Sequence, residues 1–296
     1  MSIQLLRPIA TAALVLTLAA CSSGGDGNAN DTIDGGGPGG GSNGNENANS
    51  SFGNPNQNED QIRPGVRITA NGSSCTSNFI YGDSAGNFYI GAAAHCFSPD
   101  SNRGIDACNT ANLAIGTSVG IQNAVHDGTL IYSSWRSMQD NGETPGSNAC
   151  TYNDFALVRI DSRDHDNIHP AAIAFEGPRG LLRGGANVGD RAYSYGQSSS
   201  HQGIRSNQEK DGPIRSVRGN GWQYGVEFDN PGLPGDSGSA VLHETGNALG
   251  VLTVVSAGAS LTPVSNGVMS LEMGLDYAND VLSPDVSLVT WSRFTP

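Results

Sequence analysis

Lysine is almost absent from this sequence, since Lys210 is the only one among 296 residues. Charged residues make up 15% of the chain, and the excess of acidic over basic ones gives a formal net charge of −13. A protein that binds nucleic acid needs clustered cations to replace the counterions of the phosphates. The shortage of basic residues therefore argues against nucleic acid as a partner, and the acidic surface predicts a soluble, weakly associating monomer.

The N-terminal segment has the features of an export signal. Arg7 precedes an apolar core at residues 9–18 that is too short to span a bilayer permanently. The tetrapeptide LAAC that ends at Cys21 resembles the lipobox of bacterial lipoproteins. We predict that residues 1–20 are a lipoprotein signal peptide and that Cys21 becomes the lipidated N-terminus. The exported protein would then be anchored by lipid in the cell envelope.

Two details bear on this prediction. Ser22, rather than aspartate, follows Cys21, which in Gram-negative lipoproteins indicates the outer membrane. The alternative is a plain secretory signal cut near Ala20. That alternative would leave Cys21 as an odd, exposed thiol in an oxidising compartment.

The composition changes twice along the rest of the chain. Residues 21–61 are mainly Gly, Asn, Ser and Asp, so they cannot bury enough apolar surface to offset their ordering entropy. We predict a disordered tether with a reach of roughly 35 Å. Residues 62–296 contain many short β-rich runs separated by turn residues, and residues 276–282 are one of few segments that look helical. This pattern predicts one all-β unit, a barrel or a sandwich.

Residues 232–240, with the sequence GLPGDSGSA, contain a candidate nucleophile, Ser237. A serine hydroxyl reacts only when a base removes its proton and fixed donors meet the oxyanion that forms. Gly235 suits this need, because a backbone without Cβ can turn sharply and leave its N–H beside that of Ser237. An ordinary loop would have the same composition. A histidine and a sheltered aspartate upstream would favour the nucleophile.

Both residue types occur upstream. His95 follows an apolar strand at residues 88–90 and three alanines, and Cys96 could pin its loop to a preceding strand through Cys75. A histidine that merely caps a strand fits this local sequence almost as well. Asp154 stands at the mouth of the apolar run 155–160, where it could accept the Nδ1 proton of a histidine.

The segments AAAHC, NDFALVRI and PGDSGSA, in the order His, Asp, Ser, resemble the signatures of the chymotrypsin-like (trypsin-type) serine endopeptidases. The run from Cys75 to Cys96 is especially similar to the bacterial branch that includes the streptogrisins and α-lytic protease. The resemblance covers residues 75–273. It implies an all-β fold of two packed six-stranded Greek-key β-barrels with the active site in the cleft between them. It also implies protein or peptide substrates and a mechanism without a cofactor or a metal.

Carried over to this sequence, the resemblance implies that Ser237 is the nucleophile, His95 the general base and then acid, and Asp154 the residue that orients His95. The oxyanion hole would be formed by the backbone N–H groups of Gly235 and Ser237. The hydroxyl of Thr253 matches the family position that supports the aspartate. Thr253 could equally be an ordinary β-branched strand residue with no role in catalysis.

Two disulfides are expected from the four cysteines other than Cys21. The resemblance implies the pair Cys75–Cys96, which would anchor the loop of His95. The pair Cys108–Cys150 has no counterpart that can be carried over from the family. It follows by elimination.

The sequence departs from the family around the substrate pocket and around Asp236. Pro231 occupies the place where an acidic residue would select Arg or Lys, and Val254 and Val255 replace an aromatic residue and a glycine. We therefore expect a preference for small or medium apolar side chains. The Ile-Val-Gly-Gly terminus that pairs with the aspartate in animal enzymes does not occur at a workable distance. Asp236 needs another partner or exposure to water, and the domain could simply fold active.

The same sequence features allow functions other than that of a peptidase. A catalytically silent domain on the same fold, used for binding at the cell surface, is the alternative function. An esterase of the G-D-S-L type is disfavoured, because that family places its serine near the N-terminus and a histidine near the C-terminus.

His165 and His169 could bind a metal, but we expect an exposed loop there. His126, His201 and His243 have no partner that the sequence identifies.

Overall fold

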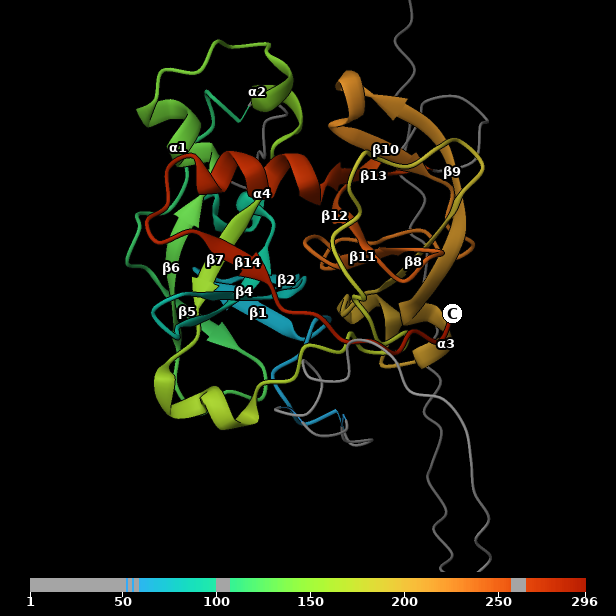
Figure 1. Cartoon of the computed structure of the whole chain (residues 1–296), viewed down its shortest axis with the longest axis horizontal. Helices are drawn as coiled ribbons and strands as arrows, with labels where there is room; N and C mark the ends of the chain where they lie inside the picture. The colour runs from blue at the N-terminus through green and yellow to red at the C-terminus, as the bar shows by residue number, and fades with distance from the viewer. Residues whose placement is uncertain (1–51, 53–54, 56–58, 100–106, 257–264) are drawn as a thin grey trace, which may run out of the picture. The chain divides into compact units, whose positions relative to one another are not determined.

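The computed structural model describes residues 52, 55, 59–99, 107–256 and 265–296 (Figure 1). The predicted signal peptide, Cys21 and most of the predicted tether lie outside the described residues, as do the side chains of residues 254–256. None of the described helices combines the length and the apolar composition that a membrane span requires.

The first half of the described chain, together with β14 from its C-terminal end, forms an eight-stranded antiparallel sheet. The strand order is β14-β3-β4-β7-β6-β5-β1-β2. Its strands are β1 (Arg67–Ala70), β2 (Ser73–Thr76), β3 (Ile80–Asp83), β4 (Phe88–Ala92), β5 (Ser118–Ile121), β6 (Gly128–Ser133), β7 (Ala156–Arg159) and β14 (Val286–Leu288). Two helices, α1 (Ser134–Asp140) and α2 (Asn148–Tyr152), and two 3-10 turns, η1 (Ala94–Phe97) and η2 (Ser162–Asn167), connect them.

The second half forms a closed six-stranded barrel, in the order β10-β13-β12-β11-β8-β9. Its strands are β8 (Arg191–Tyr195), β9 (Glu209–Arg218), β10 (Gln223–Val226), β11 (Ala240–His243), β12 (Ala248–Ser256) and β13 (Ser265–Ser270). The helices of this half are α3 (Arg205–Gln208) and α4 (Leu271–Asn279), with the 3-10 turns η3 (Ser199–His201) and η4 (Gly219–Gly221).

The predicted all-β, two-barrel fold is confirmed, with two differences in detail. The first sheet has eight strands rather than six, and one of them, β14, returns from the C-terminus to pair with β3. The helix predicted over residues 276–282 begins earlier, at Leu271, directly after β13 ends at Ser270. The side chain of Ser270 accepts a hydrogen bond from the N–H of Met273, which caps the helix at this earlier position.

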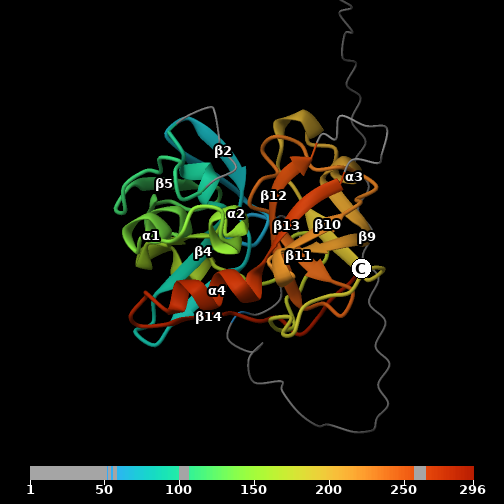
Figure 2. The same cartoon turned by 90° about the horizontal axis from the view of Figure 1, so that it is seen from above.

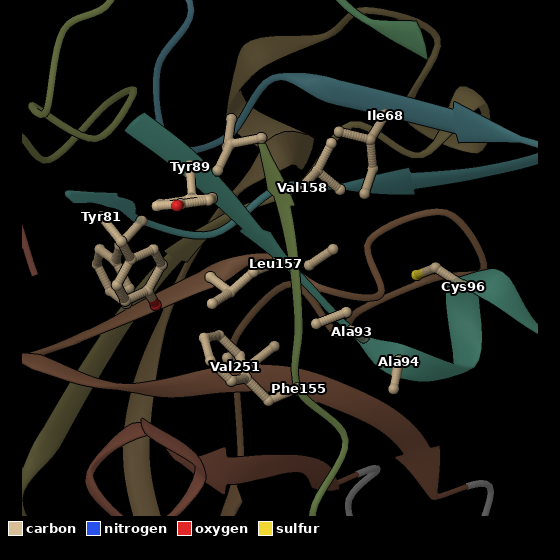
Figure 3. Close-up of a cluster of buried hydrophobic side chains, with 14 of the residues drawn as sticks. Ile68, Tyr81, Tyr89, Ala93, Ala94, Cys96, Phe155, Leu157, Val158 and Val251 are labelled. Carbon is tan, nitrogen blue, oxygen red and sulfur yellow. The ribbon is translucent and has the colours of Figure 1, made fainter. Parts of the chain in front are cut away.

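The largest hydrophobic core is shared by both halves. Tyr81 and Phe155 of the first half pack edge to face, with ring centroids 5.6 Å apart. Val251 of β12 belongs to the same buried cluster, and Figure 3 shows it beside Phe155. Leu271 of α4 is also fully buried in this cluster, and Figures 1 and 2 show α4 leaving β13 to lie along the first half. The two halves are therefore joined by apolar packing as well as by the chain.

Candidate active site

Sheet register brings His95 and Asp154 together. Strands β4 and β7 are antiparallel neighbours in which Ala92 pairs with Ala156. The C-terminal end of β4 therefore lies beside the N-terminal end of β7. His95 follows β4 within η1, and Asp154 directly precedes β7, so both side chains emerge at that edge.

The two residues make a double contact. Nδ1 of His95 lies 2.6 Å from Oδ2 of Asp154, and the backbone N–H of His95 donates to Oδ1 at 2.8 Å. Both residues are buried. A carboxylate only accepts hydrogen bonds, so this contact places the ring proton on Nδ1 and leaves Nε2 as an acceptor.

The loop of Ser237 is attached to the first half of the chain. The N–H of Thr76 donates to the carbonyl of Ser237 at 2.9 Å, and Nδ2 of Asn78 donates to the carbonyl of Gly238 at 3.3 Å. Gly238 has a φ of +90°, and a Cβ there would clash with the carbonyl of Thr76, so the close approach requires glycine. Sγ of Cys96 lies 3.9 Å from the carbonyl oxygen of Ser237. The nucleophile candidate therefore lies beside the loop that carries His95.

The predicted oxyanion donors are both free of internal partners. Within the described residues, the backbone N–H groups of Gly235 and Ser237 make no hydrogen bond. Ser237 is half-buried and Gly235 has a φ of +104°. Oγ1 of Thr76 donates to the carbonyl of Gly235 at 2.8 Å, which fixes that carbonyl away from solvent. Two unoccupied backbone N–H groups in one turn can bind a developing oxyanion.

Both expected cysteine pairs are disulfides in the structure. Cys75 and Cys96 are joined with their Cα atoms 6.2 Å apart, and Cys108 and Cys150 with theirs 5.3 Å apart. The first disulfide links β2 to η1 and so restrains the loop of His95. Its sulfurs lie near His95, but disulfide sulfurs are not thiolates and cannot serve as metal ligands there.

A second group of potential metal ligands, Asp190, His243 and Glu244, lies near the surface. Its polar atoms already have protein partners. Oδ2 of Asp190 accepts from the N–H of Asn187 and lies 3.2 Å from Nε2 of His243, while Glu244 accepts from the N–H of Arg191. These contacts account for the group without an ion.

Asp236, whose partner the sequence left open, is completely buried and paired. Its Oδ2 lies 3.1 Å from Nζ of Lys210 and 2.8 Å from Nε2 of His201. The N–H groups of Ser198 and Leu233 also donate to the carboxylate, each at 2.9 Å. The only lysine of the chain thus supplies the charge that a new N-terminus would supply in the animal enzymes.

Lys210 is itself fully buried, and this burial lowers the pKa of its ammonium group from the usual value. The negative charge of Asp236 opposes that effect and favours the charged form of Lys210. His201 contacts both groups, with its Nε2 2.8 Å from Oδ2 of Asp236 and 3.3 Å from Nζ of Lys210. Each buried charge in this cluster therefore has a partner, as a low-dielectric interior requires.

None of the remaining histidines is exposed, although His126 and His165 are only half-buried. His169 is fully buried, accepts a hydrogen bond from the N–H of Ala171 and packs against Trp291 at 4.6 Å between ring centroids. The expectation of an exposed loop at His169 is therefore wrong, because the ring fills a gap beside Trp291. The three histidines without a partner in the sequence all contact a carboxylate in the structure: His126 with Asp164, His201 with Asp236, and His243 with Asp190.

The predicted substrate-binding residues are placed as follows. Thr253 lies at a bulge in β12, and its hydroxyl donates to the carbonyl of Gly267 at 3.3 Å. The bond to Asp154 expected from the resemblance is not among the hydrogen bonds of the described residues. Pro231 is half-buried just before the loop of Ser237. Val254 and Val255 continue β12, but their side chains lie outside the described part.

Comparison with known proteins identifies the family. Residues 75–251, more than half of the chain, match the family model of a trypsin-like peptidase domain. The chain belongs to the trypsin-like peptidase family. It is a serine-type peptidase, and the family implies protein or peptide substrates. The matched residues of this peptidase include His95, Asp154 and Ser237.

Solved structures to which the chain is similar include three bacterial proteases. Protease A of Thermobifida fusca is 18% identical and aligns over 78% of this chain and 99% of its own, with a TM-score of 0.50. Nocardiopsis protease is 19% identical over 77% and 98% of the two chains, with a TM-score of 0.46. Cellulomonas bogoriensis chymotrypsin is 18% identical over 78% and 99%, with a TM-score of 0.47. No curated protein sequence matches the peptidase. The match to protease A shows a shared fold.

Proposed function

We propose that this peptidase is a serine endopeptidase that works through an acyl-enzyme on Ser237. The observation that carries the proposal is the two-point contact between His95 and Asp154, beside a loop in which the N–H groups of Gly235 and Ser237 are unoccupied. A histidine held in one tautomer, a neighbouring serine and two free backbone donors together make the arrangement that acyl transfer needs.

In the proposed mechanism, Oγ of Ser237 attacks the carbonyl carbon of the scissile peptide bond while Nε2 of His95 takes the hydroxyl proton. Asp154 accepts a hydrogen bond from the Nδ1–H of His95 throughout and stabilises the imidazolium. The oxyanion of the tetrahedral intermediate receives hydrogen bonds from the N–H groups of Gly235 and Ser237. Collapse breaks the C–N bond, and His95 gives its proton to the leaving amine. Water then hydrolyses the acyl-enzyme by the same steps.

For the substrate side chain, the proposal is a preference for small or medium apolar residues. In the described part, a Cβ added at Gly232, the residue after Pro231, would contact Leu252 and Asn266, neither of which is acidic. Asp229, the nearest preceding carboxylate in sequence, is exposed. The β-branched side chains of Val254 and Val255 would narrow the substrate pocket, and the strand of Thr253 would pair with the substrate backbone. A panel of peptides varied at the cleaved residue tests this, and cleavage mainly after Arg or Lys would contradict it.

Lipid anchoring on Cys21 is proposed from the sequence alone. The domain would then act in the cell envelope, held to a membrane by the tether of residues 21–61. Growth with a labelled fatty acid, followed by isolation of the protein, should give a labelled chain that begins at Cys21. Cys21→Ser should abolish the label. A mature chain that begins before or after Cys21 and carries no lipid would contradict anchoring without affecting the peptidase.

The decisive experiment for the chemistry is covalent labelling with a fluorophosphonate. The native chain should be labelled at Ser237 and should cleave a peptide substrate, and both signals should be lost in Ser237→Ala and in His95→Ala. Ser239→Ala is the matched control, because Ser239 lies in the same loop but its hydroxyl donates to the carbonyl of Asp236. A folded native chain that is not labelled would favour the silent binding domain.

A further inference from the structure

Ser198, which follows β8 in the second barrel, holds two residues of the nucleophile loop. Its N–H donates to Oδ1 of Asp236 at 2.9 Å, and its Oγ lies 2.7 Å from the carbonyl oxygen of Pro234. The N–H of Ser200 donates to the same Oγ at 3.2 Å. Because a lone pair of Oγ is occupied by Ser200, the hydroxyl proton is directed to Pro234. Ser198 is buried, so these contacts are sheltered from water.

The residues from Leu233 to Asp236 form a tight turn. The N–H of Asp236 donates to the carbonyl of Leu233 at 2.9 Å, Pro234 is the second residue, and Gly235 is the third with a φ of +104°. Proline followed by a residue at positive φ is typical of a type II turn. A type I turn has the same ends but a central peptide turned over, with a negative φ at the third residue. Glycine populates both conformations, so the turn sequence alone does not choose between them.

The orientation of that central peptide decides where one oxyanion donor points. In a planar trans peptide the C=O and the N–H point in opposite directions. The hydroxyl of Ser198, by holding the carbonyl of Pro234 on one side, fixes the N–H of Gly235 on the other. The next carbonyl, that of Gly235, is held by Oγ1 of Thr76. The turn is thus clamped on two successive carbonyls by two hydroxyls.

We propose that Ser198 is a positioning residue for the oxyanion hole, because its hydroxyl selects the turn conformation in which the N–H of Gly235 is available to the substrate. The inference rests on the proposed function of Gly235 and Ser237. Ser198 acts through Pro234 and does not touch the substrate. Without its hydroxyl, the peptide between Pro234 and Gly235 is free to turn over, and a fraction of the molecules would present a carbonyl where the N–H is needed.

The expected effect is intermediate in size. Removal of an oxyanion donor outright lowers kcat by about 100-fold to 1,000-fold. Loss of a single neutral hydrogen bond shifts a conformational ratio by about 3-fold to 10-fold. Because such a shift lowers the competent fraction by no more than the same factor, Ser198→Ala should lower kcat by about 2-fold to 10-fold. KM should stay within about 2-fold, since the substrate side chain binds elsewhere.

The test uses the full chain and three variants: Ser198→Ala, Ser198→Thr, which keeps the hydroxyl, and Ser200→Ala, which removes an exposed neighbouring hydroxyl. For each, kcat and KM are measured on a peptide amide, and the inhibition constant is measured for a peptide boronic acid, whose tetrahedral adduct places an oxygen in the hole. Ser198→Ala should weaken inhibition by the same factor as it lowers kcat. Ser198→Thr should recover most of both, and Ser200→Ala should match the native chain.

Fluorophosphonate labelling of the native chain at Ser237 distinguishes a failure of the proposed function from a failure of the role proposed for Ser198. An unlabelled native chain would overturn the proposed function and this inference with it. A labelled, active native chain together with a native-like kcat and inhibition constant in Ser198→Ala would overturn the role of Ser198 alone. A loss that Ser198→Thr does not recover would also overturn it. If Ser198→Ala does not fold, Ser198→Gly removes the same hydroxyl, and the same results decide the question.

Discussion

His95 and Asp154 contact each other twice: Nδ1 of His95 lies 2.6 Å from one carboxylate oxygen, and the backbone N–H of His95 lies 2.8 Å from the other. The first contact sets the tautomer of the ring, and the second sets the position of the carboxylate relative to the loop. A side chain at position 154 that cannot accept hydrogen bonds from both Nδ1 and the backbone N–H of His95 must disturb one of these contacts.

Asp154→Asn should lower kcat by about 10,000-fold with a small change in KM. An asparagine amide that accepts from the backbone N–H of His95 turns its NH₂ group toward Nδ1, and this places the ring proton on Nε2, where it blocks proton transfer from Ser237. The free energy of unfolding should change little, because the volume is conserved. Steady-state kinetics with a peptide amide and urea unfolding measure the two quantities. Asp161→Asn is the control, because Asp161 is half-buried after β7, and it should leave kcat unchanged. A decrease of kcat smaller than tenfold in Asp154→Asn would contradict the proposed role of Asp154 in orienting His95.

Lys210→Met should lower the free energy of unfolding by about 3 kcal/mol or more, because it leaves the buried carboxylate of Asp236 without its cation. The remaining soluble protein should also lose peptidase activity, since Asp236 directly precedes Ser237. Arg218→Met is a matched control, because Arg218 lies on the same strand, β9, but is exposed. Urea unfolding compares the variants. Equal stability of Lys210→Met and the native chain would show that the pair is not needed to hold Asp236.

Stability should depend on Asp83 at low pH. Hydrogen bonds from the side chains of Asn87 and Tyr89 lower the pKa of the Asp83 carboxyl from 3.8 to about 2. Because the folded-state pKa lies below the unfolded one, its contribution to stability is present above about pH 4 and is lost as the pH falls toward 2. Urea unfolding of the native chain and Asp83→Asn should show a difference at pH 5 that shrinks toward about pH 2. A difference that stays constant would contradict this. Tyr89→Phe should give a smaller effect of the same sign.

The two disulfides should differ in their effect on catalysis. They close loops with sequence separations of 21 and 42 residues, so the entropic model predicts losses of about 3 and about 4 kcal/mol of stability on removal. Only the pair Cys75–Cys96 adjoins His95. Replacing both of its cysteines by alanine should lower kcat as well as stability, whereas the same change at Cys108 and Cys150 should lower mainly stability. Unfolding in urea and kcat below the transition test this; an equal loss of kcat in both would contradict it.

The strands that were predictable are those with apolar or alternating sequences. The runs around residues 88–90 and 155–160 became β4 and β7, because their side chains are buried in the shared core. Strand β9 was not predicted, although it is the longest of the described strands. Its inward-facing positions include Lys210 and Gly212, so it lacks the apolar alternation that marks a strand.

The triad candidates were predictable from short local motifs, but their supporting contacts were not. His201 and Asp236 are 35 residues apart, and only the closure of the second barrel brings them together. No local pattern marks such a pair. The available signal was Lys210, the single lysine of the chain, which stands between Glu209 and Asp211 in a β-rich region.

The last elements of the chain complete what the first elements begin. β14 supplies an edge of the sheet through β3, and α4 and β12 supply Leu271 and Val251 to a core built mostly from residues before 175. During synthesis from the N-terminus, the first half therefore emerges with an unfilled core and an unpaired strand edge, and it closes only after the residues around Val286 are available. The order in which the chain is made is thus not the order in which its parts become stable, and the site at His95 matures late although its residues are made early.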